Sequence, residues 1–137
     1  MLKEKAQISM EFLVVLLTTV AILLVFMPVF SRLQKSVLFA IDVYNASSSL
    51  RELKTNVAIL NSLGVGSSFV WELDFINSVE FKCSNKKAEF FLTNSLQTKS
   101  LFLDLDLLCN DFFDRISEKK RYLVSKTTQN NLNIAPI

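Results

Sequence analysis

The sequence predicts an α+β protein in which a long, kinked N-terminal helix, transmembrane in its first part, packs on a small antiparallel β-sheet. Three observations predict this class. An uncharged apolar run stands near the N-terminus, apolar residues at helical spacing follow it, and the second half of the chain alternates with period two. The 137 residues suffice for one small domain beside that helix.

Composition excludes the common enzyme classes. The chain has no His, which removes the commonest general base, the Ser-His-Asp triad and His-ligated metal sites. Its two glycines, Gly64 and Gly66, cannot form a dinucleotide-binding fingerprint or a P-loop. With 15 Lys and Arg against 13 Asp and Glu, the net charge of +2 gives no reason to expect a nucleic-acid partner. We therefore expect no enzymatic activity, no catalytic residues and no cofactor.

The first element is the apolar run 12–30, which contains no charged residue, Gly, Asn or Gln. A helix of this length is about 28 Å long, close to the roughly 30 Å hydrocarbon thickness of a bilayer. A buried core helix is disfavoured, because so small a remaining domain cannot readily enclose a helix that is apolar on all sides. A cleaved secretory signal needs a shorter run that ends in small residues, whereas residues 26–30 are bulky. We expect the run to span a membrane and to be retained.

A short motif stands directly before this run. It comprises Gln7, Ser9 and Glu11, with Lys5 and Ala6 ahead of it. The stretch resembles the class III signal peptide of archaeal type IV pilin-like proteins, whose pattern is Gln-x-Ser-x-Glu-x-x-x-Leu. The resemblance is specific over about ten residues and general over the helix that follows.

The resemblance implies a processing site and a topology. In the family, a class III prepilin peptidase cuts on the cytoplasmic side just before the Gln, here between Ala6 and Gln7, and removes a leader of residues 1–6. The sequence departs from the pattern twice, because Ala6 stands where Gly is common and Val15 stands at the Leu position. The expected precursor is a single-pass protein of the cell membrane, with its N-terminus in the cytoplasm and its C-terminal part outside.

The resemblance also implies roles in assembly for Glu11 and Pro28, which stand where pilins carry a Glu and a helix-bending Pro. A carboxylate at the hydrocarbon edge is costly and usually has a partner; in the family this partner is the new N-terminal amine of a neighbouring subunit. Proline lacks an N–H and bends or locally melts a helix. Without the resemblance, Glu11 is an interfacial carboxylate and Pro28 an ordinary kink in a membrane span.

Helical spacing continues beyond the run. Two sets of apolar residues recur every three or four positions: Leu33, Val37, Ile41 and Tyr44, then Ala46, Leu50, Leu53, Val57 and Leu60. We expect both sets to form one apolar stripe, with the serines 47–49 near the shift between the sets as the place where its phase could change. Gly64 fits a helix C-cap. The predicted helix over 7–63 is on the order of 85 Å long if unbroken. Its first half therefore needs neighbours outside its own chain, first membrane lipid and then copies of itself or other pilins.

The remainder, 67–137, is expected to be a small, β-rich extracellular head domain. Alternation predicts six strands: 70–75, 79–83, 88–93, 101–107, 122–126 and 132–134, with a turn at 84–87. One face of such a sheet is dry, and the helical stripe from Leu50 to Leu60 is the expected cover. The sequence leaves open whether 112–116 is a short helix or an edge segment.

Two further features concern sites on the head and the helix. Cys83 and Cys109 are expected to form a disulfide if the head lies outside the cell; a pair of buried free thiols is the alternative. Asn45-Ala46-Ser47 matches the N-glycosylation pattern, so Asn45 is a candidate glycan site inside the predicted helix.

Four aspartates, Asp104, Asp106, Asp111 and Asp114, raise the question of a calcium site. Calcium needs several converging oxygens, usually on a loop with Gly at its sharp turn, and no Gly stands near these residues. We expect a solvated sheet face and no metal site.

Taken together, the expected protein is a structural subunit of an archaeal type IV pilus-like surface filament, either within the filament or associated with it. The alternative is a single-pass, membrane-anchored extracellular binding domain that does not polymerise. The signal at Gln7, Ser9 and Glu11 discriminates between them, because an anchored receptor has no use for a cut there.

Overall fold

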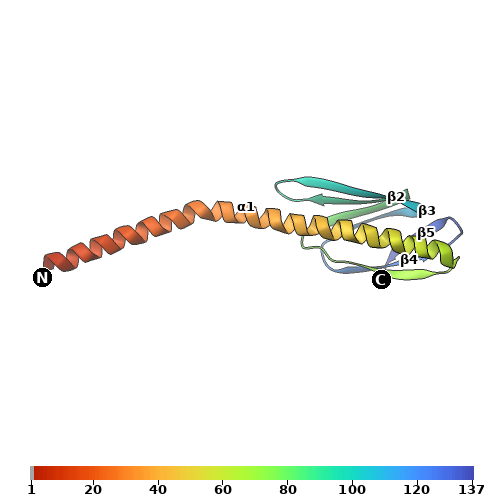
Figure 1. Cartoon of the computed structure of the whole chain (residues 1–137), viewed down its shortest axis with the longest axis horizontal. Helices are drawn as coiled ribbons and strands as arrows, with labels where there is room; N and C mark the ends of the chain where they lie inside the picture. The colour runs from red at the N-terminus through yellow and green to blue at the C-terminus, as the bar shows by residue number, and fades with distance from the viewer. Residues whose placement is uncertain (1) are drawn as a thin grey trace. The chain divides into compact units, whose positions relative to one another are not determined.

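The computed structural model describes the backbone of residues 2–137 and the side chains of residues 10–137. Along this part of the chain, helix α1 (Leu2–Leu63) is followed by strands β1 (Ser68–Leu73), β2 (Val79–Thr93), β3 (Thr98–Ile116), β4 (Lys120–Lys126) and β5 (Asn131–Pro136) (Figure 1). The predicted α+β class is confirmed, and α1 ends at Leu63, as the C-cap at Gly64 predicts. The chain divides into two compact units that meet between Ser36 and Val37.

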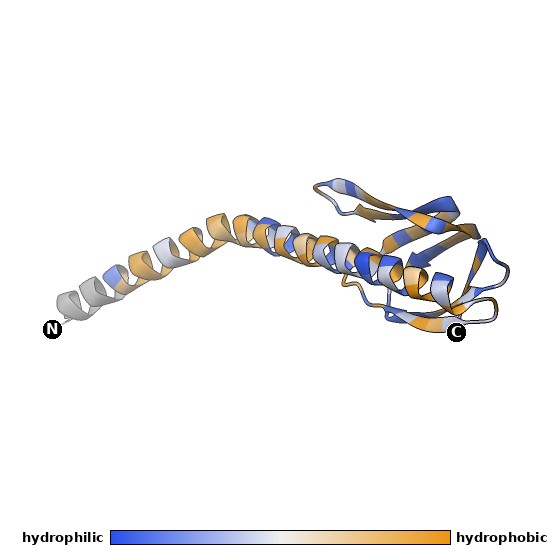
Figure 2. Cartoon of the chain, turned by 45° about the vertical axis from the view of Figure 1, so that its right-hand side comes forward, coloured by the Kyte–Doolittle hydropathy of each residue, from blue (hydrophilic) through white to orange (hydrophobic). Residues whose placement is uncertain are grey.

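The first unit is the N-terminal part of α1. Every side chain from Met10 to Ser36 is exposed, and Figure 2 shows this stretch as predominantly hydrophobic. Thr18 and Thr19 donate their hydroxyl hydrogens to carbonyl oxygens one turn earlier in the helix, at 2.8–3.0 Å. These bonds satisfy the hydroxyl donors within the helix itself, so they add little cost to an apolar environment.

The second unit packs the remainder of α1 on a five-stranded sheet with the order β1-β4-β5-β3-β2. All neighbours are antiparallel except β3 and β5, which run parallel over Leu108–Cys109 and Asn131–Leu132. The sheet is therefore mixed, where the sequence predicted an antiparallel one. The parallel pair arises because β5 folds back antiparallel to β4 and enters between β4 and β3, which themselves run in opposite directions.

The predicted turn at 84–87 is wrong. β2 runs through it as one strand, with register shifts on either side of Asn85, whose φ of 55° lies in the left-handed region. This is a β-bulge, in which polar residues bend a strand without ending it. The chain reverses instead after Thr93, where the Asn94 side-chain oxygen accepts hydrogen bonds from the backbone N–H groups of Leu96 and Gln97, both at 2.8 Å.

The segment 112–116, left open by the sequence, is the final part of β3. Phe112 pairs with Cys83 and Ile116 with Val79. β3 thereby reaches 19 residues, far longer than the 6 residues of β5 beside it.

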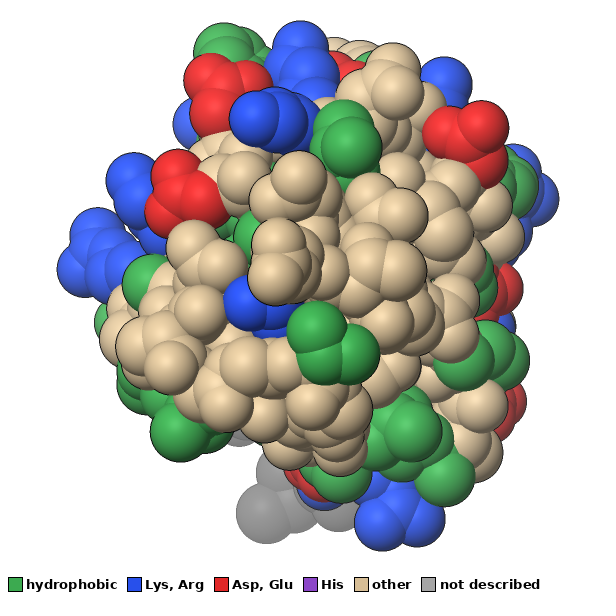
Figure 3. Space-filling view, turned by 90° about the vertical axis from the view of Figure 1, so that its right-hand side faces the viewer, with side chains coloured by type: hydrophobic (Ala, Val, Ile, Leu, Met, Phe, Trp, Pro, Cys, Tyr) green, Lys and Arg blue, Asp and Glu red, His purple; other side chains and the backbone are tan. Residues whose placement is uncertain are grey.

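The core lies between α1 and one face of the sheet. Leu50, Leu53, Val57 and Leu60 are at most 5% exposed, so the predicted cover of the dry face is confirmed. Beneath them, aromatic rings form a connected cluster with centroids 4.9–6.2 Å apart: Trp71, Phe75, Phe81, Phe90, Phe112 and Tyr122. Figure 3 shows an end of this unit, where charged side chains of both signs are interspersed and hydrophobic side chains form small separate groups.

Candidate functional site

The most unusual surface among the described residues is the N-terminal part of α1. It contains a segment that is long and apolar enough to cross a membrane, and none of that segment is buried within the chain. Val25 and Met27 are 70% exposed and Phe30 is 68% exposed. A helix that is apolar all round requires a surrounding of lipid or of other helices, because single soluble domains rarely expose so large a patch.

Glu11 lies at the N-terminal end of this surface. Its side chain is exposed, and no hydrogen bond or ion pair joins it to any residue from Met10 onwards. Within the described side chains it is therefore available to a group from outside the chain. Pro28 lies inside α1 and does not end it. The other predicted signal and cleavage residues, Lys5, Ala6, Gln7 and Ser9, have side chains outside the described residues.

The expectation of one continuous stripe beyond the apolar run is wrong. Val37, Ile41 and Tyr44 are exposed by 58, 40 and 73%, whereas Ala46 and the rest of the second set are buried against the sheet. Tyr44 and Ala46 are two positions apart, which is about 200° around a helix, so the two sets lie on opposite faces. The residues that the sheet covers at this level are instead Phe39 and Asp42.

Residues 37–44 of α1 are thus apolar on two faces, of which the sheet covers one. We call Val37, Ile41 and Tyr44 the outer stripe. Beyond Tyr44 the exposed positions of α1 become mostly polar, beginning with Ser47 and Ser48. The outer stripe therefore has a defined C-terminal limit, which marks where an apolar partner of α1 would end.

A buried carboxylate fixes the helix to the sheet, and the sequence analysis missed it. Asp42 is 1% exposed. It accepts hydrogen bonds from the backbone N–H groups of Ile76 (2.8 Å) and Asn77 (3.0 Å) and from the Asn77 side-chain amide (2.5 Å). The available signal was a single acidic residue at helical spacing between Phe39 and Ala46. Its position predicts a buried, partnered charge, because an unpaired one is too costly.

A second buried charge lies at the C-terminal end of α1. Lys126 of β4 is 5% exposed. Its ammonium group donates to the backbone carbonyl and the side-chain oxygen of Asn61, each at 3.1 Å. A cation beside the last carbonyls of a helix is favourable, because these groups carry the negative end of the helix dipole.

The remaining predicted sites lie on the second unit. Cys83 and Cys109 are joined by a disulfide between β2 and β3, next to the bulge, with their Cα atoms 6.0 Å apart. Asn45 is half-buried on α1. Asp104 and Asp106 are exposed on β3, and Asp111 accepts a hydrogen bond of 2.6 Å from the Ser84 hydroxyl.

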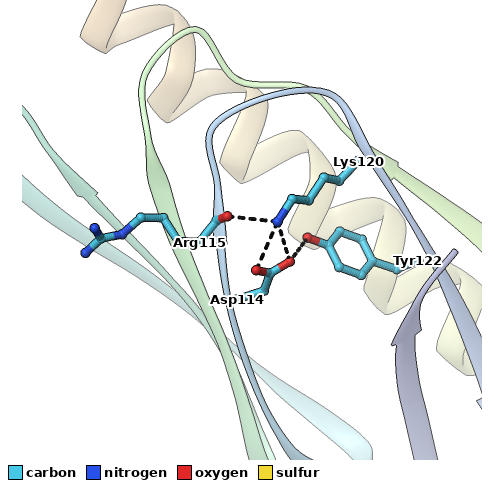
Figure 4. A network of polar contacts seen from close by, with 4 residues as sticks. All are labelled: Asp114, Arg115, Lys120 and Tyr122. Atoms are coloured by element: carbon cyan, nitrogen blue, oxygen red, sulfur yellow. Dashed lines mark hydrogen bonds and ion pairs between the residues drawn. The ribbon is translucent and has the colours of Figure 1, made fainter.

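Asp114, the last of the four aspartates, belongs to a polar cluster at the β3–β4 turn (Figure 4). Its carboxylate accepts bonds from the Lys120 ammonium, at 2.8 and 3.0 Å, and from the Tyr122 hydroxyl at 2.8 Å. Burial raises the pKa of Asp114, but these hydrogen bonds outweigh burial and hold that pKa below its usual value. Burial and the hydrogen bond to Asp114 raise the pKa of Tyr122.

Lys120 also donates to the Arg115 carbonyl at 2.9 Å, so the cluster braces the turn. Among the described residues, no group of three His, Cys, Asp or Glu side chains is arranged to hold a metal ion. No protein-family model, curated protein or solved structure matches this chain.

Proposed function

We propose that this chain is a structural subunit of an archaeal type IV pilus-like surface filament, incorporated into the filament or associated with it. The supporting observation is the fully exposed, apolar surface of α1 from Met10 to Phe30. In the precursor, lipid covers this surface and the chain crosses the cell membrane once. In the filament, apolar helices of neighbouring copies or of other pilins replace the lipid.

The outer stripe favours assembly over simple anchoring. Arg32 and Lys35 follow the apolar run, and basic residues at such positions are typical of a membrane interface. Val37, Ile41 and Tyr44 follow those basic residues in the chain, yet they are 58, 40 and 73% exposed. A membrane anchor does not require this stripe, whereas a helix bundle that continues above the membrane does.

Glu11 supplies the register of that bundle. Leu and Val side chains look alike to a neighbouring helix, so apolar packing alone lets two helices slide by one turn at little cost. A charge pair between Glu11 and the N-terminal amine of a neighbour penalises each wrong register, because breaking a buried pair costs roughly 3–5 kcal/mol. Such an amine becomes available after a class III prepilin peptidase cuts between Ala6 and Gln7.

Intact-mass analysis and N-terminal sequencing of the protein from membrane and shed-filament fractions test this proposal. We expect a mature protein that begins at Gln7 in both fractions. A protein that retains Met1, or that begins near residue 30, contradicts the proposal. Recovery from membranes only, with an uncut N-terminus, supports the alternative of an anchored extracellular binding domain.

A further inference from the structure

A groove of about 340 Å³ lies between α1 and β3 in the second unit. The groove exists because one edge of β3 is not paired with another described strand there. β5 pairs only with Leu108 and Cys109 of β3, so the preceding part of β3, from Thr98 to Leu107, has β2 on one side and no described strand on the other. The backbone edge of β3 and the adjacent face of α1 are thereby left open together.

The groove combines an apolar floor with a cationic rim. Buried Leu50 and half-buried Leu101 and Leu103 form the floor. Arg51 and Lys54 form the rim from the helix, and neither is in an ion pair with a described residue. Such a site suits an apolar side chain that stands next to an unpaired carboxylate.

The opposite rim is Phe102, which is 62% exposed. The Lys87 ammonium lies 4.5 Å from the centroid of its ring. Lys87 does not line the groove itself, so the cationic rim consists of Arg51 and Lys54.

Asp74–Ile76, the described segment between β1 and β2, has the complementary chemistry. Asp74 is exposed and forms no salt bridge with a described residue, although it lies within the electrostatic influence of Lys119, and Ile76 is 52% exposed. The segment is also rigid, because buried Asp42 accepts the N–H groups of Ile76 and Asn77. A rigid segment loses little conformational entropy on binding.

Three other exposed acidic residues, Glu72, Asp104 and Asp106, fit less well. Glu72 already pairs with Lys119. Asp104 and Asp106 stand within strand β3, where neighbouring backbone keeps them from entering a groove.

We propose that Asp74–Ile76 of one copy docks into this groove on a second copy. Ile76 contacts the leucine floor, and Asp74 lies beside Arg51 and Lys54. The groove and the segment are different surfaces of the same chain, so the contact can be repeated from copy to copy along a filament. It rests on the proposed function, because so small a contact holds two copies together only when their N-terminal helices already raise the effective concentration.

The test uses two differently tagged full-length copies that are produced together in the host. One carries Ser47→Cys, in the groove, and the other carries Ser78→Cys, next to the docking segment. The native cysteines are bonded to each other, so a short bismaleimide reagent reports on the introduced pair. We expect a mixed-tag dimer with Ser47→Cys and none with Ser48→Cys, which is exposed on the same helix but does not line the groove.

Charge reversal adds a test in which a second substitution restores cross-linking, a result that a misfolded variant would not give. Lys54→Glu in the Ser47→Cys copy is expected to lower the cross-link yield several-fold, and Asp74→Lys in the other copy to restore it. Failure of this rescue, or equal cross-linking of Ser48→Cys, overturns the inference. Cross-linking of the Ser47→Cys copy only to a different protein also overturns it.

A parallel sample with Ile41→Cys in both copies reports on helix association. Helix cross-links without groove cross-links overturn the docking contact and leave the filament proposal standing. Groove cross-links without helix cross-links contradict assembly through α1 and the dependence of the docking contact on that assembly. Absence of both contradicts both proposals.

Discussion

At the residue scale, Asp42 and Glu11 are two carboxylates of α1 with opposite surroundings. Asp42 is buried and receives three hydrogen bonds from the segment between β1 and β2, whereas Glu11 is exposed and has no partner among the described residues. A charge with its partners inside the chain stabilises the fold. A charge at the edge of an apolar surface, without a partner there, is suited to a partner outside the chain.

For Glu11, we expect Glu11→Ala to spare membrane insertion and cleavage but to block filament incorporation. Removing a charge from the edge of an apolar helix eases insertion, while the loss of the charge pair removes the penalty on wrong registers. The measurement is filament yield relative to mature, membrane-bound protein. Glu52→Ala, at an exposed position of α1 beyond the outer stripe, is the matched control and should assemble normally. Normal filaments from Glu11→Ala would mean that Glu11 is only an interfacial residue.

For Asp42, we expect Asp42→Ala to lower the free energy of unfolding of the second unit by about 3 kcal/mol. The substitution leaves buried donors without an acceptor, and each such loss is costly. Urea unfolding of the full chain in detergent, followed by tryptophan fluorescence of buried Trp71, measures the change. Glu52→Ala again serves as the control, with an expected change within about 0.5 kcal/mol. A loss for Asp42→Ala as small as that of the control contradicts this role.

At the element scale, the structure differs from the sequence-based prediction mainly inside the long hairpin of β2 and β3. The polar residues 84–87 have turn composition, but the pairing of β2 with β3 on both sides absorbs them as a bulge at Asn85. The helix end at Leu63 was predictable because Gly64 signals it locally. The partners of Asp42, the parallel pair of β3 with β5 and the groove were not, because each depends on contacts between residues far apart in the chain.

The polar cluster at the β3–β4 turn predicts how stability varies with pH. The pKa of Asp114 is lowered in the folded state, so its contribution is present above the usual carboxyl pKa of 3.8 and is lost as pH falls below it. The pKa of Tyr122 is raised from 10.0, so its contribution is present below pH 10 and is lost as pH rises above it.

The free energy of unfolding, measured as a function of pH, should therefore fall both below pH 3.8 and above pH 10. In the Asp114→Asn variant, the decrease at acid pH should be smaller than in the unmodified chain. Asp106→Asn, at an exposed position of the same strand, is the control. An unchanged acid limb in Asp114→Asn would assign acid sensitivity to other carboxylates.

The disulfide joins β2 and β3 beside the bulge, where strand pairing is interrupted. The two cysteines are 26 positions apart in the sequence. In the chain-entropy description, closing a loop of this length stabilises the fold by about 3 kcal/mol. Cys83→Ala with Cys109→Ala should lower the unfolding free energy by about this amount. Unreduced, denatured protein should show no thiol reactive towards a maleimide; labelling of both cysteines would contradict the bond.

At the scale of the whole molecule, the chain has two kinds of apolar surface with different fates. The inner face of α1 from Phe39 to Leu60 is buried against the sheet of its own chain. The apolar run and the outer stripe are not covered by any described residue. Lipid suffices for the run, so the outer stripe is the surface that separates a polymerising subunit from a monomeric anchored domain.

We therefore expect Ile41→Gln to leave membrane insertion, cleavage and the fold of the second unit unchanged, and to reduce filament incorporation strongly. Ile41 is 40% exposed in the single chain, so the polar side chain disturbs little there, whereas burial of its amide between helices is costly. Ile59→Gln is the matched control, because Ile59 is 50% exposed on the same helix but lies beyond the limit at Tyr44. Both variants should unfold like the unmodified chain, and only Ile41→Gln should accumulate as mature membrane protein without entering filaments. If both variants assemble normally, the stripe is solvent-facing in the filament and the helix bundle ends at the membrane surface. If Ile59→Gln is the one that fails, the contact lies further along α1 than the polarity of its surface indicates.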